Sequence, residues 1–148
     1  MAFLLDEEDA MFTGDNVLGH GTAVFEDLAA YMSSLELMAS KAKGRAYPGH
    51  GEVIEDGKQK ILGYIAHRKE RENQILEVLN QAKQKKEAKE GAITSMEIVK
   101  IIYADVPENL HEPAERGVVQ VLQKLVKDGR VEEGGEGRWR VASAGASL

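Results

Sequence analysis

Apolar and polar positions in the first part of the chain predict a hairpin followed by a helix. Two short apolar runs, residues 2–5 and 10–13, flank four consecutive acidic residues, a pattern typical of a β-hairpin with a charged tip. Within residues 25–38, apolar side chains recur every three or four positions, which predicts an amphipathic helix. Gly44 is expected to end that helix region.

A second strand–helix pair follows in the same block. Residues 45–47 predict a short strand that ends at a glycine-bearing loop. Asp56 is placed to N-cap a long helix, whose apolar residues carry it to about residue 88. The first block is therefore expected to fold in the order β-β-loop-α-β-loop-α.

The pattern changes after Gly91, where a second block begins. Residues 94–97 read Thr-Ser-Met-Glu, the sequence of a capping box, and a short helix is expected to follow them. Pro107 and Pro113 are expected to bracket a turn before a second helix that Gly129 ends.

The second block is expected to close with a hairpin. Residues 130–132 and 138–141 flank a glycine-rich turn, which predicts two antiparallel strands. Helix, turn, helix and two-stranded wing is the order of a winged helix. We therefore predict domains at 1–90 and 91–142, with a frayed tail at 143–148.

The amino-acid composition limits the kinds of active or metal site the chain can form more than it limits the class of protein. The chain has 148 residues, a net charge of −6, no cysteine and only four histidines. The absence of cysteine excludes disulfides, thiolate metal sites and cysteine nucleophiles. No apolar run is long enough for a membrane span and no secretion signal opens the chain, so an intracellular place, cytoplasmic or mitochondrial, is expected.

Two residues at predicted strand ends are candidate metal ligands. Asp15 follows Phe-Thr-Gly, and His50 lies between two glycines in Pro-Gly-His-Gly. Ligands of α/β layers collect at the carboxyl ends of strands, and zinc binds both His nitrogen and Asp oxygen. The alternatives are a turn cap for Asp15 and a loop residue bonded to its own backbone for His50. Two ligands alone do not complete a four-coordinate site.

These motifs resemble a known family. The Phe-Thr-Gly-Asp segment ending at Asp15 and the Tyr-Pro-Gly-His-Gly segment around His50 look like the last two metal-binding motifs of the metallo-β-lactamase superfamily. Residues 16–28, 64–68, 97–103 and 107–111 resemble the metallo-β-lactamase-like-2 branch, which is related to fungal acyl-carrier-protein thioesterases. The resemblance covers residues 2–142. It implies an α+β fold, the C-terminal part of an αββα sandwich followed by a winged helix.

The resemblance also implies an activity. In that family, the residue matching Asp15 bridges two zinc ions and the one matching His50 binds the second, and a metal-bound hydroxide attacks the substrate. The substrate would be single-stranded RNA, as for an endoribonuclease, with an acyl-carrier-protein thioester as the alternative. A non-catalytic winged-helix interaction module is the alternative of another class.

The family's principal ligand motif, H-x-H-x-D-H, does not occur in this sequence. We therefore expect a fragment of a longer hydrolase, inactive alone, whose partners are the N-terminal half of its catalytic domain and the substrate, with a homo-oligomer as a further possibility. No membrane partner is expected.

Other basic residues are weaker candidates. His20, His67 and Arg68 could bind substrate, but a loop residue is the favoured interpretation for His20, and a solvated helix face is favoured for His67 and Arg68. The winged helix offers residues that could contact phosphates, but acidic residues stand among them, so a packing role is favoured. The residues are Arg116, Gln120, Gln123, Lys124, Lys127, Arg138 and Arg140.

Overall fold

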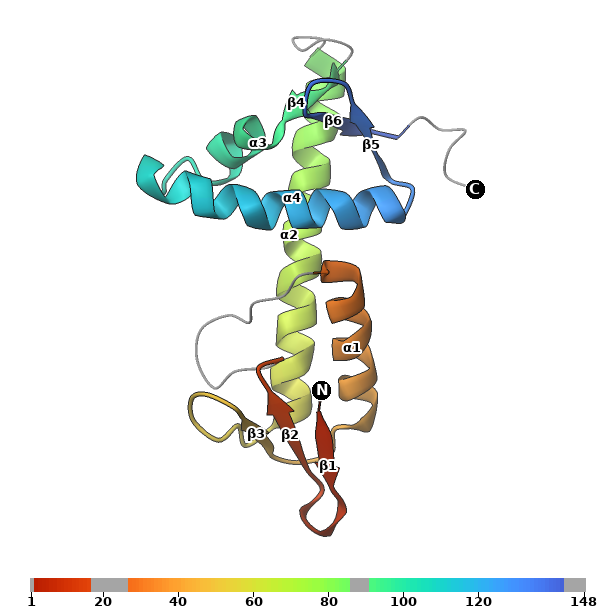
Figure 1. The fold of residues 1–148 in the computed structure, drawn as a ribbon, viewed down its shortest axis with the longest axis vertical. Helices are drawn as coiled ribbons and strands as arrows, with labels where there is room; N and C mark the ends of the chain where they lie inside the picture. The colour runs from red at the N-terminus through yellow and green to blue at the C-terminus, as the bar shows by residue number, and fades with distance from the viewer. Residues whose placement is uncertain (1, 17–26, 86–90, 143–148) are drawn as a thin grey trace. The chain divides into compact units, whose positions relative to one another are not determined.

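A computed structural model describes residues 2–16, 27–85 and 91–142 (Figure 1). The chain divides into two compact units, Met1–Lys69 and Glu70–Leu148, and each is described by itself. The division falls inside one helix, α2 (Gly57–Lys85), which supplies buried residues to both units. The predicted domain bounds at residues 90 and 91 stay a prediction, and the predicted tail at 143–148 lies outside the described residues. Among the described helices, none is long and apolar enough to cross a bilayer.

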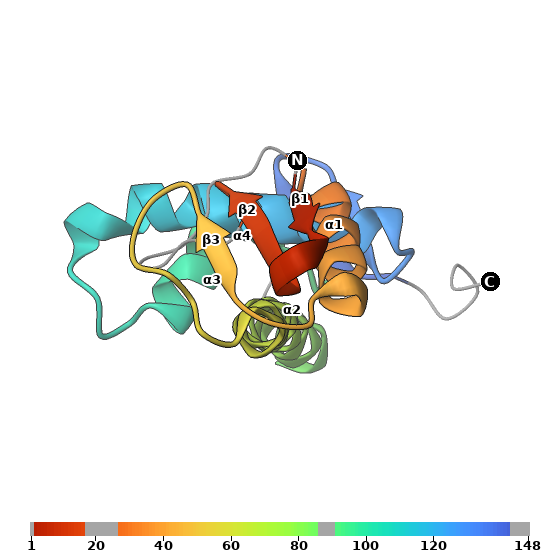
Figure 2. The same ribbon diagram turned by 90° about the horizontal axis from the view of Figure 1, so that it is seen from below.

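The first unit contains a three-stranded sheet in the order β1-β2-β3. Strands β1 (Phe3–Leu5) and β2 (Ala10–Gly14) form the predicted antiparallel hairpin, whose acidic tip is a short 3₁₀ turn. Strand β3 (Ala46–Pro48) pairs with β2 in parallel, which the crossover through a helix permits. Figure 2 shows the three strands side by side.

Two helices complete this unit, and each begins at an acidic cap, of which the one at Asp56 was predicted from the sequence. Helix α1 (Leu28–Lys41) starts after Asp27, whose side chain accepts a hydrogen bond from the amide of Ala30. Helix α2 starts after Asp56, whose carboxylate accepts one from the amide of Gln59. Such caps satisfy amide donors that have no partner within the helix. The order β-β-α-β-α is confirmed.

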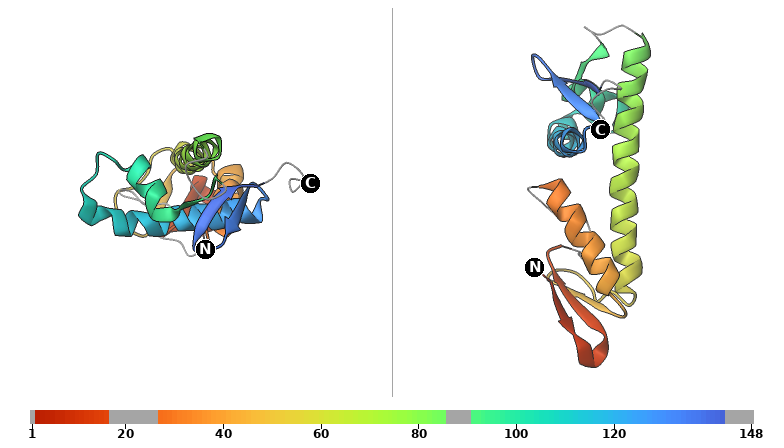
Figure 3. Two further views of the ribbon diagram at one scale, coloured as in Figure 1. Left: turned by 90° about the horizontal axis from the view of Figure 1, so that it is seen from above. Right: turned by 90° about the vertical axis from the view of Figure 1, so that its right-hand side faces the viewer.

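The second unit has the helix–turn–helix and wing of the predicted winged helix. Helix α3 (Ser95–Ile102) begins at the complete capping box of Thr94 and Glu97, and helix α4 (His111–Lys127) follows a short 3₁₀ turn. Strands β5 (Val131–Gly134) and β6 (Arg138–Val141) form the wing hairpin. Figure 3 shows the hairpin beside α4.

A third strand joins this wing, and the sequence did not indicate it. Strand β4 (Ile93–Thr94) pairs with β6, giving the sheet order β4-β6-β5. It has two residues, too few for any alternation of apolar and polar side chains to be visible. Its pairing places Ile93 opposite Trp139, and both are buried.

The prediction that Pro107 and Pro113 bracket a turn is wrong at its second end. Helix α4 begins at His111, so Pro113 lies in its first turn. Backbone amides in a first turn have no partner within the helix, so the amide that proline lacks costs nothing there. The turn is held instead by His111, whose buried Nε2 lies 3.1 Å from the carbonyl oxygen of Tyr103 and 3.0 Å from that of Val106.

A buried ion pair joins α4 to α2 within the second unit. Lys124 Nζ lies 2.8 Å from Glu72 Oε1 and 2.9 Å from Asp128 Oδ2. Among the described residues, Glu72 Oε1 meets no donor at hydrogen-bond angles, so its contact with Lys124 is mainly electrostatic. Partial burial lowers the pKa of Lys124, but the close contacts with Glu72 and Asp128 outweigh burial and raise it above its usual value. Lys124 therefore stays charged in the folded protein.

Replacing Lys124 by methionine would leave the Glu72 carboxylate buried without a counter-charge. The side chain of Glu72 is only 8% exposed, so we expect a loss of about 3 kcal/mol in the free energy of unfolding. Urea denaturation followed by circular dichroism measures it. The matched control is Lys100→Met on the exposed face of α3, expected to change stability by less than about 0.5 kcal/mol. Equal stabilities of the two variants would contradict the role of the pair.

Candidate metal-ligand site

The site begins where β2 ends. The pairing of β2 with β3 is irregular between Phe12 and Gly14, and such bulges redirect the side chains that follow. Gly14 has φ +55°, a conformation in which a side chain is disfavoured, so the chain turns sharply before Asp15. The backbone amide of Asn16 donates a 3.1 Å hydrogen bond to the carbonyl oxygen of Thr13, which closes the turn. The Asp15 carboxylate is thereby held outside the sheet edge, and its side chain is 79% exposed.

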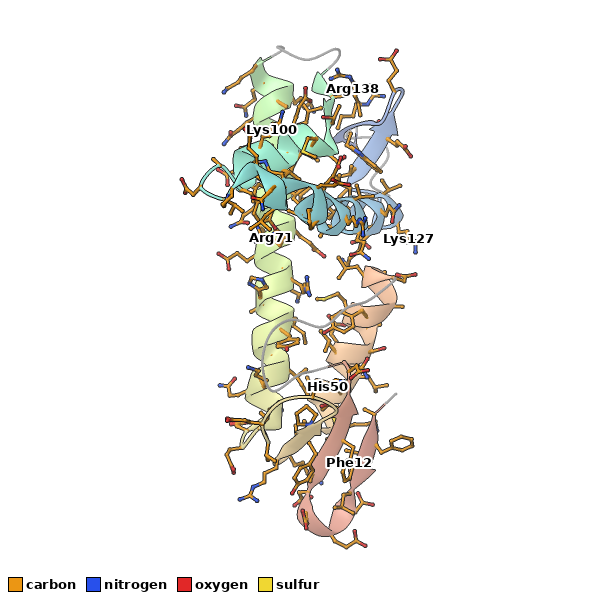
Figure 4. The ribbon with its side chains drawn as sticks, turned by 60° about the vertical axis from the view of Figure 1, so that its left-hand side comes forward. Phe12, His50, Arg71, Lys100, Lys127 and Arg138 are labelled. Carbon is orange, nitrogen blue, oxygen red and sulfur yellow. The ribbon has the colours of Figure 1, made fainter. Side chains whose placement is uncertain are left out.

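His50 reaches the same place from the end of β3. The amide of Gly49 donates to the carbonyl of Gly14 at 2.8 Å, which extends the parallel pair by one bond. His50 follows, and its Nε2 lies 3.5 Å from Asp15 Oδ1. Figure 4 shows His50 in the loop next to the end of the sheet. The two sequence-predicted ligands are thus neighbours in the fold.

Gly49 lies in the narrow space between the two strand ends. A Cβ atom there would lie 2.9 Å from Asp15 Oδ1 and 3.2 Å from the carbonyl carbon and oxygen of Gly14. Real Cβ atoms essentially never come within 3.0 Å of another heavy atom. Any side chain at this position would push the Asp15 carboxylate away from His50.

Tyr31 fixes the other side of the aspartate turn. Its hydroxyl donates to the carbonyl oxygen of Asn16 at 2.6 Å, which ties the turn to α1. Burial raises the pKa of Tyr31 to about 12, with the charge of Arg68 acting in the opposite direction. Sequence periodicity identified Tyr31 only as an apolar helix position, because its hydroxyl partner lies in a distant segment.

The donor set fits part of a zinc site. An aspartate offers two oxygens and a histidine one nitrogen, both ordinary zinc ligands, and both face solvent at a strand end. Among residues 2–16, 27–85 and 91–142, no group of three or more His, Asp or Glu side chains is placed to hold a metal. Asp15 and His50 could therefore hold a metal only together with ligands from elsewhere.

The remaining candidates do not gather at this pair in the described structure. His20 lies outside the described residues. His67 is exposed on α2. Arg68, half-buried on the same helix, acts electrostatically on the Tyr31 hydroxyl, which places its charge near the aspartate turn. The roles of His20, His67 and Arg68 in substrate binding stay predictions.

Replacing Gly49 by alanine tests the space between the strand ends. The added methyl group would clash with Asp15. We therefore expect the zinc affinity of the full-length protein to fall about 10- to 100-fold, as it does when a residue that orients a metal ligand is replaced. Competition with a chromogenic chelator measures the affinity. Gly63→Ala is the matched control, because a Cβ there meets nothing within 4 Å. An unchanged affinity in Gly49→Ala would refute the argument.

Replacing Tyr31 by phenylalanine tests the tie between α1 and the aspartate turn. The variant loses one partly buried hydrogen bond, so we expect it to be about 1 kcal/mol less stable at neutral pH. Since the pKa is raised on folding, the stability from neutral Tyr31 is present below pH 10 and is lost as the pH rises through about 12. Tyrosinate absorbance during alkaline titration should lose its transition near pH 12 in the variant. A transition that persists would assign that pKa to another tyrosine.

Comparison with known proteins agrees with this fold. The family model described as Beta-lactamase associated winged helix domain matches residues 94–139. A metallo-beta-lactamase family protein from Thermus thermophilus superimposes with a TM-score of 0.67 at 24% identity, and a Beta-lactamase domain protein from Burkholderia ambifaria with 0.74 at 20%. Each alignment covers 95% of this chain and 44% of the other. At these identities the likeness establishes the fold, and it confirms the predicted α+β class.

Curated relatives are more similar in sequence. Lactamase-like protein ptaB of Pestalotiopsis fici is 43% identical over 143 residues, which is 94% of this chain and 46% of that protein. An Atrochrysone carboxyl ACP thioesterase of Aspergillus chevalieri has the same identity and coverage. The Beta-lactamase-like protein 2 homolog of Caenorhabditis elegans is 47% identical over 128 residues, 86% of this chain and 41% of that protein.

The chain therefore spans less than half the length of these relatives. Similarity over nearly all of the chain, the matched winged-helix domain and the structural neighbours agree with one another. The chain is a homologue of the lactamase-like proteins, with the metallo-beta-lactamase fold and a beta-lactamase associated winged helix domain.

Proposed function

We propose that this chain supplies two metal ligands, Asp15 and His50, to a zinc-dependent hydrolase of the metallo-beta-lactamase fold. The observation that carries the proposal is the 3.5 Å approach of His50 Nε2 to Asp15 Oδ1 at the carboxyl ends of two parallel strands. The lactamase-like relatives support a hydrolase family. Zinc bound at such a site polarises the group under attack and lowers the pKa of a coordinated water.

The chain's own residues have distinct parts in this proposal. Asp15 offers two oxygens, one for each of two cations, which suits a bridging role, and His50 offers Nε2 to one of them. Gly49 leaves the space in which the two side chains meet. Tyr31 holds the turn after Asp15 through the Asn16 carbonyl and so supports the backbone that carries the carboxylate. The protein thereby pre-organises ligands rather than supplying a nucleophile.

We propose single-stranded RNA as the substrate. Support comes from the resemblance of residues 16–28, 64–68, 97–103 and 107–111 to the metallo-β-lactamase-like-2 branch. The similarity to the Caenorhabditis elegans Beta-lactamase-like protein 2 homolog adds to it. An acyl-carrier-protein thioester is the second candidate. It is favoured by the 43% identity to a protein named as an ACP thioesterase. Attack by activated water serves both substrates, and the groups around the site select between them.

The remaining ligands would come from the part of the catalytic domain that the longer relatives have in addition. An apolar hollow of about 470 Å³ in the first unit fits its docking. Phe3 and Leu37 on its lining are 62% and 59% exposed, far more than large apolar side chains in a finished core. A second copy of this chain covering the hollow is the competing arrangement.

The test compares Asp15→Asn with the wild type in the full-length protein. We expect bound zinc, measured by atomic emission, to fall. Hydrolysis should drop more than about 100-fold, because losing a ligand costs more than disturbing a residue that only supports a ligand. Labelled single-stranded RNA and an acyl-carrier thioester are assayed in parallel. Asp6→Asn, at the exposed hairpin tip, is the matched control.

Each outcome bears on one part of the proposal. Full zinc and full hydrolysis in Asp15→Asn would refute the ligand role. If the wild type hydrolyses the thioester and leaves the RNA intact, the second candidate replaces RNA as the proposed substrate. Absence of both activities and of zinc from the full-length wild type would favour a non-catalytic winged-helix interaction module.

A further inference from the structure

The loop that carries His50 has little packing of its own. Residues 49–53, directly after β3, are all exposed, and two of them are glycines. Gly51 has φ +91°, a backbone conformation that side chains rarely adopt. Figure 1 shows this loop leaving β3 and returning to the start of α2. Many conformations are accessible to an exposed loop with two glycines, so the position of His50 depends on contacts at the two ends of the loop.

Backbone hydrogen bonds close the base of this loop. Ala46 and Ile54 exchange two of them, 2.8 Å from the Ala46 amide to the Ile54 carbonyl oxygen and 2.9 Å in the reverse direction. Further from the loop end, the amide of Gly57 donates to the carbonyl of Gly44 at 2.9 Å. Ala46 is 0% exposed, so this base lies in the core of the first unit. The loop therefore has a fixed base and an exposed end.

Polar side chains cross the same base on its solvent side. Arg45 Nε donates to Glu55 Oε2 at 2.9 Å, which joins the two limbs of the loop. The hydroxyl of Tyr47 donates to Glu8 Oε2 at 3.0 Å, which joins the loop to the tip of the β1–β2 hairpin. The charge of Glu55, followed by a hydrogen bond with Tyr47, raises the pKa of the Arg45 guanidinium above its usual value.

Tyr47 gives this polar contact a rigid support. Its ring packs against Phe12 with the ring centroids 5.3 Å apart, and the two residues are partners in the pairing of β3 with β2. Tyr47 precedes His50 by three positions, and Phe12 precedes Asp15 by three positions. This aromatic contact therefore joins the two strands that end at the candidate ligands.

We propose that Arg45 and Glu55 are positioning residues for His50, which hold its loop in the conformation that binds zinc. Their side chains are 58% and 76% exposed, and an exposed ion pair contributes little to overall stability. The same small free energy has a larger effect on a loop whose conformations differ little in free energy. Without the pair, a smaller fraction of the molecules presents His50 beside Asp15, and the apparent zinc affinity falls in proportion to that fraction. This proposal rests on the zinc-ligand role of His50 proposed above.

An ion pair that only stabilises the first unit is the alternative. The position of the pair favours the positioning role. The hydrogen bond from Gly49 to Gly14 restrains the limb before His50. The contact of Glu55 with Arg45 restrains the limb after it, which the pairing of β3 with β2 does not include. The pair thus acts on the limb that strand pairing leaves unrestrained.

The test compares Glu55→Gln with the wild type in the full-length protein. Zinc affinity is measured by competition with a chromogenic chelator, and stability by thermal melting followed by circular dichroism. We expect Glu55→Gln to bind zinc about 2- to 5-fold more weakly, the range equivalent to the loss of one exposed ion pair, and to melt close to the wild type. Salt screens an exposed pair, so the difference in zinc affinity should shrink as the ionic strength rises.

Reversing the pair gives a second, independent measurement. Arg45→Glu and Glu55→Arg each place like charges across the base of the loop, so each should weaken zinc binding. The double variant restores an opposite pair and should recover most of the affinity. The matched control is Glu132→Gln, which removes the same kind of contact, Arg140 Nε to Glu132 Oε2 at 3.1 Å, from two antiparallel strands of the wing. It should leave the zinc affinity unchanged.

The variant His50→Ala in the same assay separates this proposal from the ligand role. A large loss of zinc affinity in His50→Ala, with a smaller loss in Glu55→Gln and recovery in the charge-reversed double variant, would support the proposal. A loss in His50→Ala with wild-type affinity in Glu55→Gln at low salt would overturn the positioning role and leave the ligand role intact. Wild-type affinity in His50→Ala would overturn the ligand role and this proposal together. A lower melting temperature of Glu55→Gln with unchanged zinc affinity would assign the pair to stability alone.

Discussion

The parallel pairing of β2 with β3 is the interaction on which the candidate site depends. The amide of Met11 donates to the carbonyl of Arg45, and the amide of Gly49 to that of Gly14, so two segments separated by α1 run in the same direction and end together. Parallel strands require a crossover connection, and α1 is part of that crossover. The helix also contributes Tyr31, which ties down the turn after Asp15. Backbone pairing, and not attraction between the side chains, therefore brings Asp15 and His50 together.

The winged-helix unit depends in a comparable way on the two faces of α4. Its apolar face fixes the helix in the core, and the Lys124–Glu72 contact secures the flank against α2. Once that flank is used, the charges left on the outer face differ from the charges in the sequence. Counted along the chain, α4 and the wing mix acids and bases, but Glu115 is engaged by Ser95 and Asp128 by Lys124. Packing decides which charges a partner meets.

Elements specified by neighbouring residues could be predicted from the sequence. The acidic hairpin tip, the Asp27 and Asp56 caps and the capping box of Thr94 and Glu97 each involve residues within four positions of one another, so short motifs reveal them. Strand β4 and the helical start before Pro113 were missed. Two strand residues carry no period, and proline in a first helical turn looks like a turn residue.

The sequence by itself determined the order of the elements and indicated the two candidate ligands, because periodicity, caps and short motifs are local properties. The α+β class followed from its resemblance to a known family. The tertiary structure alone decided that Asp15 and His50 meet, that a side chain at position 49 would crowd the Asp15 carboxylate, and that Glu115 is engaged by Ser95 and Asp128 by Lys124. These contacts join positions that only strand pairing and helix packing bring within a few ångströms, or depend on which face of a helix is buried. Sequence spacing does not contain that information, since it follows from how the whole backbone closes on its core.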